Sequence, residues 1–165
     1  MNDYAAWFRT QLRSSADGLI WGIYQLSAQQ RYHAPPQPEY FGAWPAARHL
    51  WHVASYERDL ALPSMRQWLG APMPAADAWK DSDETWELAA AQPFEQLVEA
   101  FQTVRGEQIA LLDELADADW ETPRATLWGE RPLRMVVSKT FQHTYEHADT
   151  ILRMGIWLRD VWMND

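Results

Sequence analysis

Four long segments of the chain repeat apolar residues at the three- and four-residue steps of an amphipathic helix, and none alternates in the pattern of a strand. The first segment runs from about Asp3, its expected N-cap, to Ala28. The second follows Pro45, the third opens near Pro93 and the fourth begins near Pro132. Each helix must bury its apolar stripe against another element. The pattern therefore predicts an all-α protein, most naturally a four-helix bundle.

The connections between these segments differ in length. Residues 33–45 carry four prolines, and residues 70–92 are rich in proline, alanine and aspartate, with room for one helical turn at 83–88. Pro63 is expected to break or kink the second helix. Long loops after the first and second helices allow chain paths other than simple up-down-up-down. The length of 165 residues predicts a single domain over residues 1–165.

Composition argues against several classes of partner. The net charge is −9, whereas nucleic acids and anionic membranes require a basic footprint. No apolar run reaches the length of a membrane span, and the N-terminal residues lack the pattern of a signal peptide. The chain has no cysteine, which excludes disulfides, cysteine-ligated zinc and a cysteine nucleophile. We expect a cytoplasmic protein that binds neither nucleic acid nor membrane.

Four of the five histidines fall in two short clusters about ninety residues apart. His143 and His147 are spaced i, i+4, which separates them by about 6 Å of rise and about 40° of rotation on a helix. Both imidazoles can therefore reach one metal ion. His49 and His52 lie on the second helix, where His52 shares its face with apolar residues. Several buried imidazoles need partners, and one divalent cation would satisfy them together.

The pair is not a zincin motif. A zincin carries Glu directly after the first histidine, and this chain has Thr144 there. Glu146 lies about 100° around the helix from His147, so a zincin-type general base is not assigned.

Several short runs together resemble a known family. They are the run from His52 to Glu57, the run from Lys139 to Ile151, the loop Trp128-Gly129-Glu130 and the proline-rich crossing into Trp44-Pro45. Their order and separation resemble the DinB/YfiT-like superfamily of proposed metalloenzymes, over roughly residues 5–158. The resemblance implies a four-helix bundle in an up-down-down-up arrangement. It also implies a three-histidine site for a divalent metal, zinc or nickel, with open positions for water or substrate.

The resemblance carries over to this chain residue by residue. The implied metal ligands are His52, His143 and His147. His49 lies outside that triad, and three roles are considered for it: a residue that supports a ligand, a fourth ligand, or a residue of the pocket wall. Glu57 matches an acidic position of the family, but it sits about 140° from His52 on the helix. A salt bridge is therefore expected for Glu57 rather than metal binding.

Three neutral histidines suit zinc, nickel and other borderline metals. Two reaction classes follow: metal-assisted hydrolysis of a small-molecule substrate, or S-transfer with a low-molecular-weight thiol of the bacillithiol or mycothiol type, as in relatives. The absence of cysteine fits the second class, because the nucleophile would come from outside the chain. Candidate catalytic groups are His49, Tyr56, Glu146 and Asp149.

Two alternatives do not involve catalysis. The chain could be a small-molecule-binding or stress-response protein with an apolar pocket, lined by some of Trp21, Trp44, Trp51, Trp128 and Trp157. It could also form a homodimer through tryptophans near its C-terminus, such as Trp157 and Trp162.

Overall fold

The computed structural model describes residues 3–158, and this part of the chain is mostly helical. The long helical segments are α1 (Tyr4–Tyr24), α6 (Phe94–Glu114), α7 (Leu133–Trp157), and α3 (Ala46–Tyr56) continued through the π-helix η2 (Glu57–Ala61) into α4 (Leu62–Arg66). The short elements are η1 (Gln30–Tyr32), α2 (Pro38–Phe41), η3 (Gln67–Leu69), α5 (Asp83–Ala90), β1 (Arg124–Thr126) and β2 (Gly129–Arg131).

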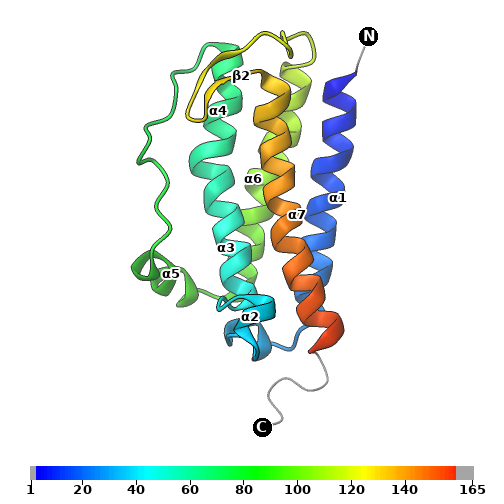
Figure 1. Cartoon of the computed structure of the whole chain (residues 1–165), viewed down its shortest axis with the longest axis vertical. Coiled ribbons are helices and arrows are strands. Elements are labelled where there is room, and N and C mark those ends of the chain that lie inside the picture. The colour runs from blue at the N-terminus through cyan, green and yellow to red at the C-terminus, as the bar shows by residue number, and fades with distance from the viewer. Residues whose placement is uncertain (1–2, 159–165) are drawn as a thin grey trace.

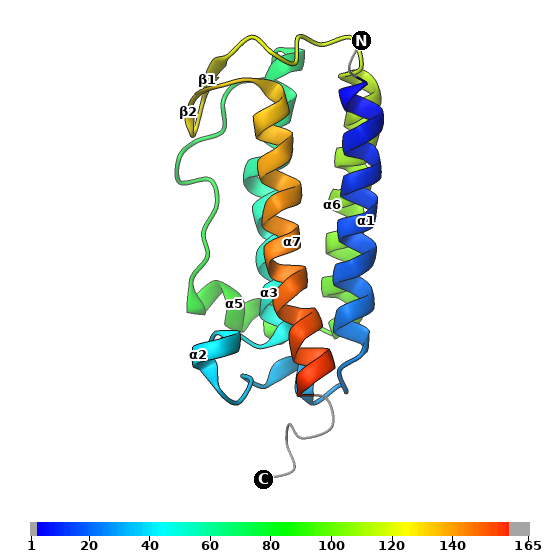
Figure 2. The ribbon, with the colours of Figure 1, turned by 45° about the vertical axis from the view of Figure 1, so that its right-hand side comes forward.

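The long segments lie side by side (Figures 1 and 2). Helices α1 and α7 run from the hairpin end of the molecule toward the end that holds α2 and α5, whereas α3–α4 and α6 run the opposite way. Helix α1 contacts α6 and α7, and α3 contacts the same two helices. The expectation of an all-α fold is confirmed apart from the antiparallel β1–β2 hairpin, which the sequence pattern does not predict.

The helices begin close to the predicted positions. Asp3 caps α1, where its Oδ1 accepts a hydrogen bond from the backbone N–H of Ala6 at 2.9 Å. Helices α3, α6 and α7 each start directly after a proline, namely Pro45, Pro93 and Pro132. Proline suits these boundaries because the first residues of a helix have no intrahelical acceptor for their N–H groups.

Pro63 does not break the second long helix, but the regular α-helix gives way to a π-helix directly before α4. Pro63 lies in the first turn of α4, directly after the π-helix, where the N–H of Leu62 bonds to the carbonyl of Glu57 five residues earlier. Proline offers no N–H and its ring crowds the carbonyl four residues back. The wider π turn accommodates the proline, so the chain stays helical.

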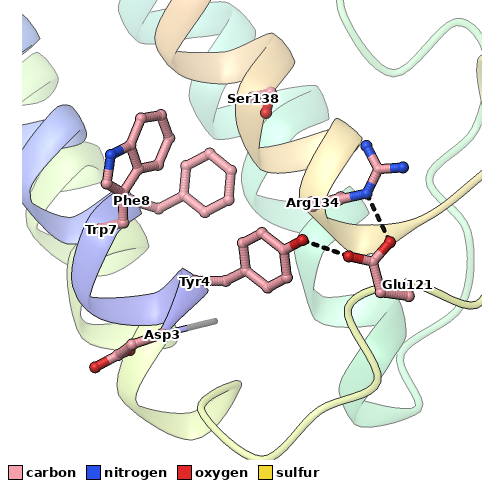
Figure 3. A pocket seen from close by; sticks show the side chains of 7 residues that line it. All are labelled: Asp3, Tyr4, Trp7, Phe8, Glu121, Arg134 and Ser138. Atoms are coloured by element: carbon pink, nitrogen blue, oxygen red, sulfur yellow. Dashed lines mark hydrogen bonds and ion pairs between the residues drawn. The ribbon is translucent and has the colours of Figure 1, made fainter. Parts of the chain in front are cut away.

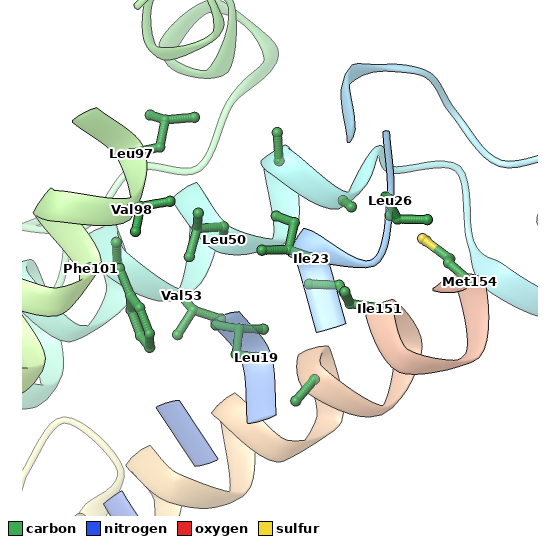
Figure 4. Packing of buried hydrophobic residues seen from close by; sticks show 14 of the residues in the cluster. Leu19, Ile23, Leu26, Leu50, Val53, Leu97, Val98, Phe101, Ile151 and Met154 are labelled. Carbon is green, nitrogen blue, oxygen red and sulfur yellow. The ribbon is translucent and has the colours of Figure 1, made fainter. Parts of the chain in front are cut away.

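The core consists of two apolar clusters. The first includes Leu19 of α1, Leu50 of α3, Phe101 of α6 and Ile151 of α7, whose side chains point toward one another (Figure 4). The second, toward the hairpin end, includes Phe8, Leu12, Leu62, Leu112 and Val137. Along each long helix, buried polar residues lie between members of the two clusters; they include Ser15, Glu57, Arg105 and Thr144.

Arg105 is the centre of this polar layer. Its guanidinium forms an ion pair with Glu57, with Nε 3.1 Å from Oε2, and both side chains are at most 3% exposed. Nη1 donates to the carbonyl of Leu12 at 2.6 Å and to Ser15 Oγ at 2.9 Å, and Nη2 donates to Thr144 Oγ1 at 2.7 Å. The network therefore joins α1, η2, α6 and α7. The expected salt bridge of Glu57 is confirmed.

This burial gives a stability prediction. Substituting Arg105→Met leaves the Glu57 carboxylate without its partner in the core, so we expect the free energy of unfolding to fall by about 3–5 kcal/mol. Urea unfolding followed by circular dichroism measures the change. The control is Arg66→Met, which removes a surface pair with Glu107 whose side chains are 49% and 50% exposed and which contributes about 0–1 kcal/mol. Equal losses in the two variants would contradict the prediction.

Candidate metal centre

The structure brings His52 of α3 together with His143 and His147 of α7. The Nε2 of His143 lies 3.0 Å from the Nε2 of His52 and 3.2 Å from the Nε2 of His147. One ligand atom from each residue lies within 4.8 Å of the other two. Lone pairs that face a common point repel one another unless a proton or a cation lies between them. The donor set therefore fits one divalent metal ion, and the role of the three residues as ligands stays a prediction.

Burial lowers the pKa of each of the four clustered histidines, which favours their neutral form. Burial, followed by the neighbouring His52 and Lys139 charges, lowers the pKa of His143 to about 3. Burial also lowers the pKa of His49 to about 4, and it strongly lowers the pKa of His147. The pKa of His52 is lowered by burial as well, but the carboxylate of Asp81 opposes that shift. Neutral imidazoles keep the lone pair that a metal ligand requires.

Asp81 joins the site from a part of the chain that gave no periodic signal. It lies in the connection between η3 and α5, and its Oδ2 is 2.7 Å from the Nδ1 of His52. Its side chain is 14% exposed and its Oδ1 is 3.7 Å from the Arg48 guanidinium. Sequence reasoning missed this residue because nothing in a loop rich in aspartate and alanine indicates which carboxylate faces α3.

His49 supports the cluster from the adjacent turn of α3. It is buried, and its Nδ1 lies 2.7 Å from the Nδ1 of His147. His52, His143 and His147 lie close enough to hold one metal ion, and His49 is not part of that group. Of the three roles considered for His49, this contact favours a residue that orients a ligand.

Aromatic side chains surround the histidines. The rings of Trp44 and Trp79 each lie 5.0 Å from the ring of His52, and the ring of Tyr56 lies 4.3 Å from that of His143. The Tyr56 hydroxyl is buried, has no hydrogen-bond partner among residues 3–158, and has its pKa raised by burial. The Tyr56 hydroxyl therefore keeps hydrogen-bonding capacity that the described residues do not use.

Two of the candidate catalytic residues are exposed on α7. Glu146 is exposed and accepts a hydrogen bond from Gln142 Nε2 at 3.0 Å. Asp149 is exposed and pairs with Arg153 at 3.0 Å. Both carboxylates are therefore engaged by neighbouring side chains of α7. Their candidate catalytic roles stay predictions.

The predicted tryptophan pocket does not form as a unit. Of its five proposed members, Trp44 lies at the histidines, whereas Trp21 and Trp157 are 56% and 69% exposed. Trp51 contacts Trp86 at a ring distance of 5.8 Å. Trp128 packs against the second apolar cluster. Trp162, named above for a dimer interface, lies outside the described residues.

A cavity of about 710 Å³ lies apart from the histidines, between the starts of α1 and α7 (Figure 3). Tyr4, Trp7 and Phe8 of α1 form its aromatic side. Arg134 donates from Nε to Glu121 Oε2 at 2.8 Å, and Glu121 also accepts from the Tyr4 hydroxyl. The remaining lining residues are Asp3 and Ser138.

The fold and the cluster together define a helical protein with a three-histidine group compatible with a metal site. Residues 10–151 match the family model described as the DinB superfamily. The chain belongs to the DinB superfamily, so the resemblance inferred from its motifs is confirmed. Searches of curated proteins and of solved structures gave no match. Within residues 3–158, no helix combines the length and the apolar composition needed to cross a membrane.

The lowered histidine pKa values predict how the stability of the metal-free protein depends on pH. Below about pH 6.5 the unfolded chain binds protons that the folded chain does not, so stability falls as the pH falls. At pH 5.5 the neutral His143 alone lowers the free energy of unfolding by about 1.4 kcal/mol relative to high pH. Urea unfolding with a chelator between pH 7.5 and 5.5 should show that His143→Gln reduces this dependence. A pH dependence in His143→Gln equal to that of the parent would contradict the prediction.

Proposed function

We propose that the protein binds one divalent metal ion through His52, His143 and His147 and acts as a metal-dependent enzyme on a small-molecule substrate. The observation that carries this proposal is the convergence of the three Nε2 atoms, with contacts of 3.0 and 3.2 Å to His143. Zinc or nickel is the proposed metal, because neutral imidazoles suit borderline cations. Three protein ligands leave a position for water or substrate.

A divalent metal held there supplies Lewis acidity, which activates a water molecule or a thiol as a nucleophile. The chain has no cysteine, so a thiol nucleophile would come from a low-molecular-weight co-substrate. Hydrolysis and S-transfer to an electrophilic substrate are therefore the two proposed reaction classes. In either case Trp44 and Trp79 restrict water around the site, His49 orients His147, and the Tyr56 hydroxyl can donate to an oxygen of the substrate.

The proposal extends to the fold and the assembly. Helices α1 and α7 run opposite to α3–α4 and α6, which supports the up-down-down-up bundle of the family and a single domain. Exposed Trp21 and Trp157 support a homodimer. The charge of −9 supports a protein that binds neither nucleic acid nor membrane, and the absence of cysteine fits a cytoplasmic location.

Metal analysis tests the ligand assignment. Protein purified without a chelator or a nickel column should carry about one divalent metal per chain, measured by mass spectrometry of the elements. His143→Ala should lose that metal, because two imidazoles are a poor site for a borderline cation. His33→Ala removes an exposed histidine and should keep it. A His143→Ala protein that binds metal as tightly as the parent would show that the assignment is wrong.

The second candidate function is small-molecule binding without catalysis, favoured by the aromatic cavity beside Arg134. An amphipathic aromatic anion such as anilinonaphthalene sulfonate should bind the folded protein saturably, detected by its fluorescence. Trp7→Ala should weaken binding about tenfold, because one aromatic contact is lost. Trp21→Ala removes a similarly exposed tryptophan of the same helix and should have little effect. If both variants bind like the parent, the cavity is not the site.

A further inference from the structure

The connection of residues 70–82 is fastened to α3 at the histidine cluster. It runs along the outside of α3 and α4 before α5 begins (Figures 1 and 2). The indole Nε1 of Trp79 donates to Ser55 Oγ at 3.0 Å, and Oδ2 of Asp81 lies 2.7 Å from Nδ1 of His52. Both attachments are side-chain contacts to residues on the turn of α3 that carries His52.

The contact with Asp81 fixes how His52 can act. A carboxylate accepts hydrogen bonds, so the Nδ1 of His52 must carry the proton and donate it. The Nε2 of the neutral ring is then unprotonated, and it is the atom that faces His143 at 3.0 Å. The same hydrogen bond sets the rotation of the ring about its side-chain bonds. Asp81 thus presents the lone pair of His52 to the centre of the cluster.

Asp81 is itself held in place. The Arg48 guanidinium lies 3.7 Å from its Oδ1, and the two side chains are 13% and 14% exposed. Arg48 also lies 4.5 Å from the ring centroid of Trp44 and binds Asp83 at 2.7 Å. The carboxylate therefore has a cation on one side and an imidazole on the other, largely out of water.

We propose that Asp81 is a positioning residue of the metal centre, and that metal binding and the anchoring of residues 70–82 are coupled. This inference rests on the proposed function. A carboxylate that holds a metal-binding histidine in one tautomer strengthens metal binding. Coupling between two binding events is reciprocal, so a metal on His52 also tightens the attachment of the loop through Asp81.

The matched pair of variants is Asp81→Asn and Asp83→Asn. Both remove a carboxylate that pairs with Arg48, but Asp81 is the one that contacts His52. We expect Asp81→Asn to weaken zinc binding 10- to 100-fold by isothermal titration calorimetry. We expect Asp83→Asn to stay within twofold of the parent. Circular dichroism melts of both metal-free variants confirm that they remain folded.

Two further readouts do not depend on activity. In the metal-free parent, nitrogen-15 NMR of histidine should show His52 protonated at Nδ1, and Asp81→Asn should lose this preference. In hydrogen exchange, zinc should slow exchange in residues 76–82 of the parent but not of Asp81→Asn. If the parent binds zinc and Asp81→Asn binds it equally well, the inference is wrong and the proposed function stands. If the parent and His143→Ala both fail to bind zinc, the proposed function and this inference are overturned together.

Discussion

The buried ion pair between Arg105 and Glu57 is the interaction on which the rest of the structure depends. It ties α1, η2, α6 and α7 together at one level, between two clusters of apolar side chains. A buried charge without its partner is strongly unfavourable, so any rotation of a helix that separates the pair is resisted. Thr144 follows His143 and Glu57 follows Tyr56. The network therefore also fixes the rotation of α7 against the helix that carries His52.

The burial and the orientation of the histidine rings depend on this packing of the helices around Arg105 and Glu57. The cluster lies beside the polar layer and behind aromatic rings, where burial disfavours the charged imidazolium. In that setting His52 and His49 make well-defined polar contacts through Nδ1, with Asp81 and His147 respectively. Contacts of this kind hold imidazole rings in fixed orientations, and a preorganised set of donors binds a cation with little rearrangement.

The sequence predicted the features that depend on local periodicity. Prolines before Ala46, Phe94 and Leu133 marked the helix starts, and the i, i+4 spacing placed His143 and His147 on one face. It did not predict the hairpin, because β1 and β2 are three residues each and too short to show alternation. It did not place Trp79 and Asp81, because an irregular connection has no period. Glu146 and Asp149 are exposed on α7, and their candidate roles stay predictions.

The π-helix from Glu57 to Ala61 affects which mutations such a chain can accept in evolution. One residue corresponds to about 100° of helical rotation, so the wider turn resets the phase between the histidine-bearing half of the helix and the half that holds Leu62 and Met65. Each half can therefore meet its own requirement, one for placing His52 beside the histidines of α7 and the other for apolar packing. An insertion or deletion within the π-helix would rotate one half of the helix relative to the other by about 100° per residue. A substitution within either half would change only the contacts of that half.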